Sequence, residues 1–395
     1  MKFLTLMDMD LENKRVLVRV DYNVPLKDGE VSDDTRLKAT VPTINKLLEM
    51  NCKIILMSHL GRPKDELEKG KSAEEVRKKL TLRPVAKKLS EILGIDVAFA
   101  DDCINIELPD SDITLLENLR LHEEEEKNDA NFAKKLAGHA EIYVNDAFGA
   151  SHRKHASVYA ITKFLPSCAG FLVEKEIKEL SKLLKPEKPF IAIIGGAKAD
   201  KIGVIRTLLP KVDNMIIGGV LANTFLKSRG IDIKNSKFDE ESLKFAEEFV
   251  NNKKVLLPVD FIAADKFNEN AEAQEASASK IPNGWMIMDI GAKTIESYKE
   301  KLKNAKTVLW AGPLGVFEFS KFARGTREIA EFIASLDATT IIGGGDSAAA
   351  VQKFNLSDKM THISTGGGAS LEFIEKEGKL PGLTALEEAR NKFKK

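Results

Sequence analysis

The sequence predicts an α/β protein with two lobes, each a parallel sheet covered by helices. Short runs rich in Val, Ile and Leu alternate with longer amphipathic stretches, which is the pattern of parallel strands connected by helices. The chain has 395 residues, which suggests two or three domains of ~100–200 residues each. Apolar residues make up 43% of the chain, enough for their cores. The prediction is two Rossmann-like lobes joined by a connecting helix.

The strands of both lobes are expected at short β-branched or leucine-rich runs. In the first half these are Arg15–Val20, Lys53–Met57, Ile113–Leu116 and Glu141–Val144. In the second half they are Phe190–Ile194, Asn214–Ile217, Val255–Pro258, Thr307–Trp310 and Thr339–Ile342.

A strongly helical segment, "GFLVEKEIKELSKLLKPEKP", stands between the two sets of strands. We predict a connecting helix over residues 170–186, a first lobe over 1–169 and a second lobe over 187–379. The acidic run "HEEEEKND" is interpreted as a solvated helix start, because carboxylates suit a helix N-terminus.

Composition argues against several classes of protein. The chain has 60 basic and 60 acidic residues, whereas nucleic-acid-binding proteins are more often basic. Cys52, Cys103 and Cys168 have neither the spacing of a metal motif nor that of a disulfide framework. No apolar run approaches the ~18 residues of a membrane helix, and we expect no signal peptide, because the N-terminus has acidic residues where one needs an apolar run. We expect a soluble cytoplasmic protein.

The segments after the strands divide into two kinds. In open α/β sheets, ligands bind beyond the carboxyl ends of the strands. The first-half strands are followed by "DYN", "SHLGRP", "ENLR" and "NDAFGASHR". The second-half strands are followed by "GGAKADK", "GGVLAN", "AGPLGVFE" and "GGGDS". The first lobe therefore offers arginine and histidine, and the second offers glycine loops.

Lys198 and Lys201 stand where a helix is expected to begin after Gly195 and Gly196. Cations are unfavourable at a helix N-terminus, whereas phosphate is favourable there. We interpret the lysine pair as part of a phosphate site; the alternative is two exposed lysines on a solvated helix.

Two further glycine loops repeat this arrangement. Gly343–Gly345 precede Asp346 and Ser347, and a third loop, "STGGGAS", contains Gly367 and Gly368. Asp346 is either an ordinary helix cap or a ligand of Mg²⁺, which prefers one or two carboxylates plus substrate phosphates. Three loops in one lobe predict a polyphosphate site.

The basic residues of the first lobe come from separate segments. We expect them to form one pocket for an anion, since arginine grips carboxylate and phosphate with paired donors; for any single arginine the alternative is a surface ion pair. The residues are Arg36, His59, Arg62, Arg120 and Arg153.

This arrangement predicts phosphoryl transfer between the two lobes. No H-R-D-type catalytic base is present, and a carboxylate acceptor needs none because it is already ionised near neutral pH. Lys198 and Arg36 are the candidates for flanking the transferring group, with main-chain amides of the Gly367 and Gly368 loop.

The segments after the strands, taken together, resemble those of the phosphoglycerate kinase family. The similarity rests on "RVDYNVP", "MSHLGRP", "LLENLR", "VNDAFGASHR", "IIGGAKADKI", "LPVDF", "GPLGVFE", "IIGGGDS" and "STGGGASLE", which occur in the family's order. The resemblance implies a monomeric enzyme of glycolysis and gluconeogenesis. Its expected reaction transfers the γ-phosphate of ATP to 3-phosphoglycerate, giving ADP and 1,3-bisphosphoglycerate, with Mg²⁺.

The resemblance also assigns residues. It implies that the triose is bound by Asp21, Tyr22, Asn23, Arg36, His59, Leu60, Gly61, Arg62, Arg120 and Arg153. It implies a nucleotide site made by Ala197, Lys198, Lys201, Gly219, Gly291, Glu318, Gly344, Gly345, Asp346 and Ser347, with Mg²⁺ on Asp346. The tail over 380–395 is expected to pack back on the first lobe.

The nucleotide side departs from the family pattern. Ala311 stands where Asn is usual, Val220 where a third glycine is common and Lys237 where an apolar adenine contact is common.

Two other classes of protein fit the sequence less well. A dehydrogenase requires G-x-G-x-x-G after an early strand, and "RVDYNVP" has no such glycines. A non-catalytic phosphometabolite sensor of the same fold could keep the arginines and lose Lys198, Lys201 or Asp346, all of which are present.

Overall fold

The computed structural model describes residues 2–196, 201–278 and 280–393, which form two compact units. One unit contains the chain up to Lys178 together with the residues from Lys379 onward, and the other contains Glu179–Gly378. The boundary between them falls inside helix α6 (Phe171–Ser181). This helix ends at Ser181, five residues before the predicted limit of residue 186.

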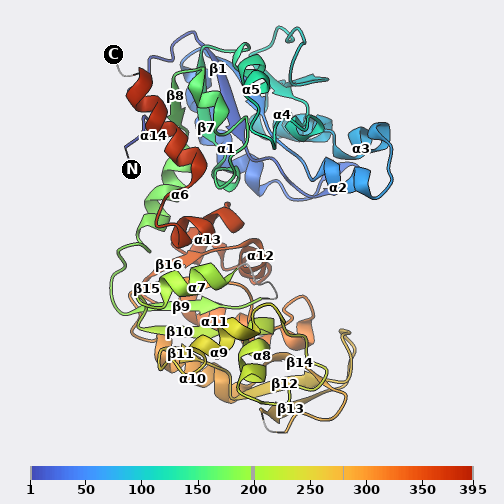
Figure 1. The fold of residues 1–395 in the computed structure, drawn as a ribbon, viewed down its shortest axis with the longest axis vertical. Coiled ribbons are helices and arrows are strands. Elements are labelled where there is room, and N and C mark those ends of the chain that lie inside the picture. The colour runs from blue at the N-terminus through green and yellow to red at the C-terminus, as the bar shows by residue number, and fades with distance from the viewer. Residues whose placement is uncertain (1, 197–200, 279, 394–395) are drawn as a thin grey trace. The chain divides into compact units, whose positions relative to one another are not determined.

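Unit 1 is built on a six-stranded sheet in which every neighbouring pair is parallel (Figure 1). The strands lie in the order β5-β6-β4-β1-β7-β8. Their bounds are β1 Arg15–Val20, β4 Lys53–Met57, β5 Ala98–Ala100, β6 Ile113–Leu116, β7 Ile142–Asp146 and β8 Ser167–Ala169. A short hairpin is formed by β2 Leu26–Lys27 and β3 Glu30–Val31.

The two faces of this sheet differ because side chains alternate along a strand. Val16, Val18 and Val20 of β1 pack in an apolar core with α1 and α4, so Leu17 and Arg19 point to the other face. Arg19 is fully buried there. The helices of this unit are α1 Thr35–Glu49, α2 Pro63–Glu68, α3 Ala73–Leu80, α4 Arg83–Leu93, α5 Ala130–Ala137 and α14 Pro381–Phe393.

Helix α14 lies against β8, although the two are separated by most of the chain (Figure 1). The amide of Gly382 donates to the carbonyl of Ser151 at 2.8 Å. A β-carbon at Gly382 would lie 2.8 Å from Val158 Cγ1, so only glycine allows this close approach. The helix therefore packs directly on the loop that follows β7.

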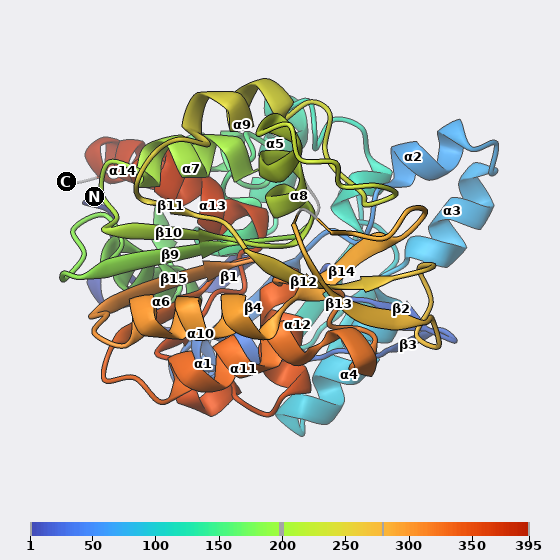
Figure 2. The same ribbon diagram turned by 90° about the horizontal axis from the view of Figure 1, so that it is seen from below.

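Unit 2 has a second six-stranded parallel sheet, in the order β11-β10-β9-β15-β16-β17. Helices α7, α9 and α13 cover one face and α10 and α11 the other (Figure 2). The strands are β9 Phe190–Ile194, β10 Asn214–Ile217, β11 Val255–Leu256, β15 Thr307–Ala311, β16 Thr339–Ile342 and β17 His362–Ile363. The helices are α7 Ile202–Leu208, α8 Gly219–Ser228, α9 Leu243–Phe249, α10 Ala292–Leu302, α11 Arg324–Ala334, α12 Gly345–Lys353 and α13 Gly368–Glu375.

The sequence did not predict the small antiparallel sheet of unit 2. It has the order β13-β12-β14, with β12 Asp260–Ala264, β13 Ala273–Ser277 and β14 Met286–Ile290. The middle strand packs apolar residues, but the edge strand β13 reads "AQEAS", which lacks the β-branched pattern used to find strands.

The predicted α/β class with two parallel sheets is confirmed, and most predicted strands have the predicted bounds. Three differ at their ends: β7 begins at Ile142 and includes Asn145 and Asp146, β11 stops at Leu256, and β15 extends to Ala311. The three cysteines are buried and free. Within the described part of the chain, no helix has the length and apolar character needed to span a membrane.

The interpretation of the acidic run as a solvated segment was wrong for one residue. Helix α5 begins directly after the run, with Asp129 accepting from the Phe132 amide at 2.8 Å. Glu125, however, is fully buried. Its carboxylate accepts from the hydroxyl of Ser157 at 2.6 Å and from the Ser157 amide at 2.9 Å.

Candidate active site

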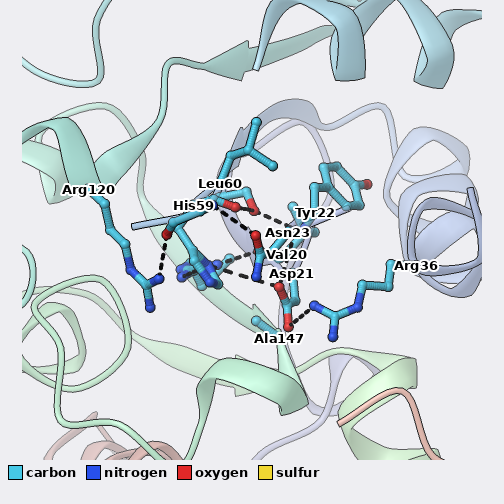
Figure 3. Close-up of polar contacts among 12 residues, drawn as sticks. Val20, Asp21, Tyr22, Asn23, Arg36, His59, Leu60, Arg120 and Ala147 are labelled. Atoms are coloured by element: carbon cyan, nitrogen blue, oxygen red, sulfur yellow. Dashed lines mark hydrogen bonds and ion pairs between the residues drawn. The ribbon is translucent and has the colours of Figure 1, made fainter. Parts of the chain in front are cut away.

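A group of basic and polar side chains, called the basic pocket below, gathers at the carboxyl ends of four adjacent strands of unit 1 (Figure 3). Asp21 follows β1, His59 follows β4, Arg120 follows β6 and Arg153 follows β7. Because these strands are neighbours in the order β6-β4-β1-β7, their ends bring the predicted residues together.

Asp21 and Arg36 form an ion pair at the edge of this pocket, with Oδ2 and NH1 2.8 Å apart. The Arg36 side chain comes from the first turn of α1 and is 31% exposed. His59 Nδ1 lies 3.9 Å from Asp21 Oδ1, which is beyond hydrogen-bond range. The guanidinium of Arg36 is thus held in place and still open to solvent.

The main chain of Gly61 is fixed by two hydrogen bonds from opposite partners. Its amide donates to Asn23 Oδ1 at 2.8 Å, and its carbonyl accepts from Arg120 NH1 at 2.8 Å. Gly61 has φ +63°, and a β-carbon would lie 2.8 Å from Leu80 Cδ2. Asn23, Gly61 and Arg120, three predicted substrate residues, are therefore one hydrogen-bonded unit.

Two predicted substrate residues have side chains that belong to the core. Tyr22 is fully buried, and its hydroxyl is hydrogen-bonded to Thr40 Oγ1 at 2.7 Å. Leu60 is 3% exposed. The main-chain groups of Tyr22 are also used within the protein: its amide donates to Ser58 Oγ at 2.8 Å and its carbonyl accepts from the Val24 amide at 2.9 Å.

Arg62, Arg120 and Arg153 line one cavity of about 760 Å³. Arg62 is largely exposed, whereas Arg120 is buried. Burial, with the nearby charge of Arg153, lowers the pKa of Arg120 to about 10. The Arg120 Nε lies 3.3 Å from Glu126 but without hydrogen-bond geometry. An anion in this cavity would offset the repulsion between the two arginines.

Sequence reasoning missed Asn118, which supports this pocket from below. It is fully buried, and its amide nitrogen donates to the carbonyls of Leu60 and Leu80 at 2.8 and 2.9 Å. Its Oδ1 accepts from the amides of Leu60 and Arg120, both at 3.1 Å. The position of Asn118 in "ENLR", directly after a strand, was the signal available.

Unit 2 contains a cavity of about 510 Å³ that is lined mostly by apolar side chains. They include Pro258, Phe261, Met288, Leu314 and Phe319. Three residues predicted for the nucleotide site line this cavity, namely Gly219, Glu318 and Asp346. Val220 and Lys237, which depart from the family pattern, also line it. Gly291 is adjacent to the lining residue Ile290, and a β-carbon there would meet the Asp260 carboxylate at 2.5 Å.

The glycines of the predicted nucleotide loops fall into two groups. A β-carbon at Gly219 would lie 2.7 Å from the Gly196 amide, so packing requires glycine there. Around Gly344, Gly345, Gly367 and Gly368, a β-carbon would meet no described atom within 4 Å. Of these four, Gly344 and Gly367 have positive φ, whereas Gly345 and Gly368 do not. Neither packing nor backbone conformation explains glycine at Gly345 and Gly368.

Lys201 lies where a helix begins, as predicted. Helix α7 begins at Ile202, and Lys201 precedes it. Its side chain is 9% exposed, and Nζ donates to the carbonyl of Gly195 at the end of β9. The other predicted residues of this loop, Ala197 and Lys198, lie outside the described residues.

Ser347 and Ala311 are both buried. Ser347 Oγ accepts from the Gly312 amide at 2.5 Å, and the Ala311 carbonyl accepts from the Gly195 amide at 2.9 Å. Ser347 therefore connects α12 to the loop after β15, which positions the main chain beside the cavity.

The Asp102, Cys103 and His122 side chains also lie together in unit 1. His122 Nε2 is hydrogen-bonded to Asp102 Oδ1 at 2.6 Å, and burial raises the pKa of the Cys103 thiol. Against the effect of burial, the hydrogen bond to His122 lowers the pKa of Asp102, so His122 and Asp102 are already paired with one another in this cluster.

A basic pocket in one α/β unit and a glycine-edged apolar cavity in the other are the architecture of a two-substrate phosphotransferase. The family model described as phosphoglycerate kinase matches residues 6–378. A phosphoglycerate kinase of Moorella thermoacetica is 51% identical over 399 residues, covering 98% of this chain and 99% of the relative. The cytosolic phosphoglycerate kinase of Triticum aestivum is 51% identical over 405 residues, covering 98% of each chain.

Two solved structures of phosphoglycerate kinases have the same fold as this chain. The phosphoglycerate kinase of Coxiella burnetii superposes with a TM-score of 0.85 at 38% identity, over 99% of this chain and 100% of the other. That of Pyrococcus horikoshii has a TM-score of 0.86 at 34% identity, with the same coverage. The chain belongs to the phosphoglycerate kinase family. It is an ATP-binding kinase of glycolysis that transfers a phosphoryl group between ATP and 3-phosphoglycerate.

Proposed function

We propose that the basic pocket of unit 1 binds 3-phosphoglycerate and that the cavity of unit 2 binds the Mg²⁺ nucleotide. The observation that carries this assignment is the convergence of Asp21, His59, Arg120 and Arg153 from four neighbouring strand ends. Buried, mutually repelling arginines are stable only with an anion or a carboxylate nearby, and one such arginine, Arg120, lines an open cavity.

On the triose side, the phosphate is held by Arg62, Arg120 and Arg153, which can donate in pairs to its oxygens. Asp21 and Asn23 position the hydroxyl, and Arg36 neutralises charge at the carboxylate.

On the nucleotide side, the base enters the apolar cavity and Glu318 accepts from the ribose hydroxyls. The phosphates lie along the open turns at Gly344–Gly345 and Gly367–Gly368, with Lys201 and Lys198 as cations. Asp346 would hold Mg²⁺: it is exposed, lies in the first turn of α12 and lines the cavity. A single carboxylate beside phosphates suits this ion, which neutralises charge on the phosphate oxygens.

The reaction needs no general base, because the acceptor carboxylate is ionised near neutral pH. Catalysis then consists of positioning and charge neutralisation by Arg36, Lys198 and the amides of Gly367 and Gly368. We propose that the two units close during turnover, with α6 and the Leu380–Gly382 turn as hinges. Small-angle scattering should show compaction only when both substrates are bound; an unchanged radius of gyration would contradict closure.

The decisive assay contains ATP, Mg²⁺ and 3-phosphoglycerate, with the product coupled to glyceraldehyde-3-phosphate dehydrogenase and followed as NADH loss. Activity should depend on 3-phosphoglycerate and disappear in Lys198→Ala, while the surface control Lys188→Ala keeps it. A folded wild type that binds both ligands without turnover would support the sensor alternative. We also propose a monomer working in the cytoplasm, which light scattering at assay concentration tests for the oligomeric state.

A further inference from the structure

A buried ionic network lies beneath the basic pocket and centres on Arg19. The Arg19 side chain is fully buried on the face of β1 opposite the α1 core. Its Nε donates to Ser157 Oγ at 2.8 Å, and NH1 donates to the carbonyl of Val20. Its NH2 lies 3.1 Å from His59 Nδ1. All three guanidinium nitrogens are therefore used.

The contact between Arg19 and His59 determines which ring nitrogen of His59 carries a hydrogen. A guanidinium only donates hydrogen bonds, so His59 Nδ1 must be the acceptor and carry no proton. Burial and the charge of Arg19 lower the pKa of His59 well below its ordinary value, which keeps the ring neutral. A neutral imidazole with an unprotonated Nδ1 carries its hydrogen on Nε2. That nitrogen has no hydrogen-bond partner among the residues that the structure describes.

The charge of Arg19 is balanced by Glu125, also fully buried. Ser157 connects the two: its hydroxyl accepts from Arg19 Nε and donates to Glu125 Oε1 at 2.6 Å. His155 Nδ1 lies 3.9 Å from Glu125 Oε1, but burial and Arg120 lower the pKa of His155 to about 3. His155 is thus neutral, and Arg19 is the buried cation that Glu125 reaches through one hydroxyl.

We propose that Arg19 is a positioning residue that holds His59 in the Nε2–H tautomer, so that His59 donates a hydrogen bond to the bound triose, and that Glu125 holds Arg19 through Ser157. This inference rests on the proposed triose site. It assigns a role to the acidic run "HEEEEKND", whose buried member anchors the network.

The first test measures the tautomer in the free protein, so it does not depend on turnover. With ¹⁵N-labelled histidine, the two ring nitrogens of His59 are assigned by comparison with a His59→Gln variant. The wild type should show a pyridine-like Nδ1 and a protonated Nε2 across pH 6–8. A protonated Nδ1 in the wild type overturns the proposal, whatever the kinetic assay shows.

The second test removes Arg19 without leaving a buried charge unpaired. Arg19→Met combined with Glu125→Gln neutralises both partners, a replacement that buried ion pairs often tolerate. Glu125→Gln alone is the matched control, because the amide oxygen can still accept from the Ser157 hydroxyl and Arg19 stays the donor to Nδ1. His59 should become a mixture of tautomers in the double variant only.

The kinetic expectation is a selective loss of triose binding. The double variant should raise KM for 3-phosphoglycerate about tenfold or more, with KM for ATP unchanged. Glu125→Gln alone should change it less than the double variant does. Equal loss for both substrates, or unchanged His59 resonances and KM in a double variant shown to be folded by circular dichroism, would assign Arg19 a purely structural role and overturn the proposal.

Discussion

Asn118 pairs with both main-chain groups of Leu60: its amide nitrogen donates to the Leu60 carbonyl at 2.8 Å and its oxygen accepts from the Leu60 amide at 3.1 Å. The same side chain also bonds to Leu80 and Arg120. One buried amide thus sets the main chain from which His59, Leu60 and Gly61 enter the pocket.

Asn118→Asp should therefore destabilise unit 1. The carboxylate loses both N–H donors and faces the carbonyls of Leu60 and Leu80, at a cost of about 2–4 kcal/mol in the free energy of unfolding. Urea unfolding followed by circular dichroism measures this change. The exposed Asn105→Asp is the control and should leave the midpoint nearly unchanged. Equal effects of the two substitutions would contradict the role of Asn118.

Arg36→Met should impair catalysis far more than folding. The Arg36–Asp21 pair is partly exposed, so its loss changes stability by no more than ~1 kcal/mol. If Arg36 neutralises the developing charge, kcat should fall about 10²–10³-fold. The surface variant Arg206→Met, which breaks the exposed pair with Glu248, should retain full kcat. A kcat for Arg36→Met within a factor of two of wild type would exclude the proposed role.

Asp146 gives unit 1 a specific dependence on pH. Its Oδ1 accepts from the amide of Leu172 at the start of α6, while Oδ2 is buried without a hydrogen-bond partner among the described residues. Burial raises the pKa of Asp146 from 3.8 to about 7. Since the folded pKa lies above the unfolded one, its stabilising contribution is complete below about pH 4 and is lost as pH rises to about 7.

Asp146→Asn removes this titration. The free energy of unfolding of wild type, relative to the variant, should fall by up to about 1.4 kcal/mol per pH unit between about pH 4 and pH 7 and then level off. Urea unfolding of both proteins at several pH values tests this, with Asp110→Asn as an exposed control. A wild-type-to-variant difference that does not change with pH would show that Asp146 titrates normally.

Gly345→Ala should weaken nucleotide binding without destabilising the fold. Because a β-carbon there meets no described atom within 4 Å and φ is not positive, the fold should tolerate alanine. If phosphates lie along this turn, the methyl group should weaken ADP binding about tenfold or more, measured by calorimetry. Unchanged affinity would remove Gly345 from the proposed site.

Lys237→Leu should strengthen nucleotide binding. Lys237 is exposed and lines a cavity whose other walls are mostly apolar, so an aliphatic side chain adds apolar contact with the base. Burial of a few tens of Å² predicts a Kd for ADP about three- to tenfold lower. Lys254→Leu, whose Nζ bonds to carbonyls outside the cavity, is the control. Weaker binding by Lys237→Leu would mean that the ammonium group contacts the nucleotide.

Local patterns were enough to predict the two parallel sheets. The runs Arg15–Val20 and Phe190–Ile194 became the strands β1 and β9 with those bounds, since buried parallel strands are continuous apolar runs. The convergence of Asp21, His59 and Arg120 was predictable as well, because parallel neighbouring strands place their carboxyl ends at one edge.

The side-chain partners could not be predicted in the same way. In the sequence, Glu125 is one carboxylate of a run that we interpret as solvated. In the structure it is buried, and it accepts a hydrogen bond from Ser157, which lies 32 residues further along the chain. The polar strand β13 is a strand only because β12 pairs with it.

By itself, the sequence determined the α/β class, the strand positions and the types of residue that follow each strand, because these depend on periodicity and on order along the chain. Only the tertiary structure decided that Arg19 points away from the α1 core and reaches Ser157, 138 residues away. It also decided that Tyr22 is a core residue and that Gly382 packs on Ser151. Each of these outcomes depends on which distant surfaces exclude water from a given side chain, and that information is absent from any local stretch of sequence.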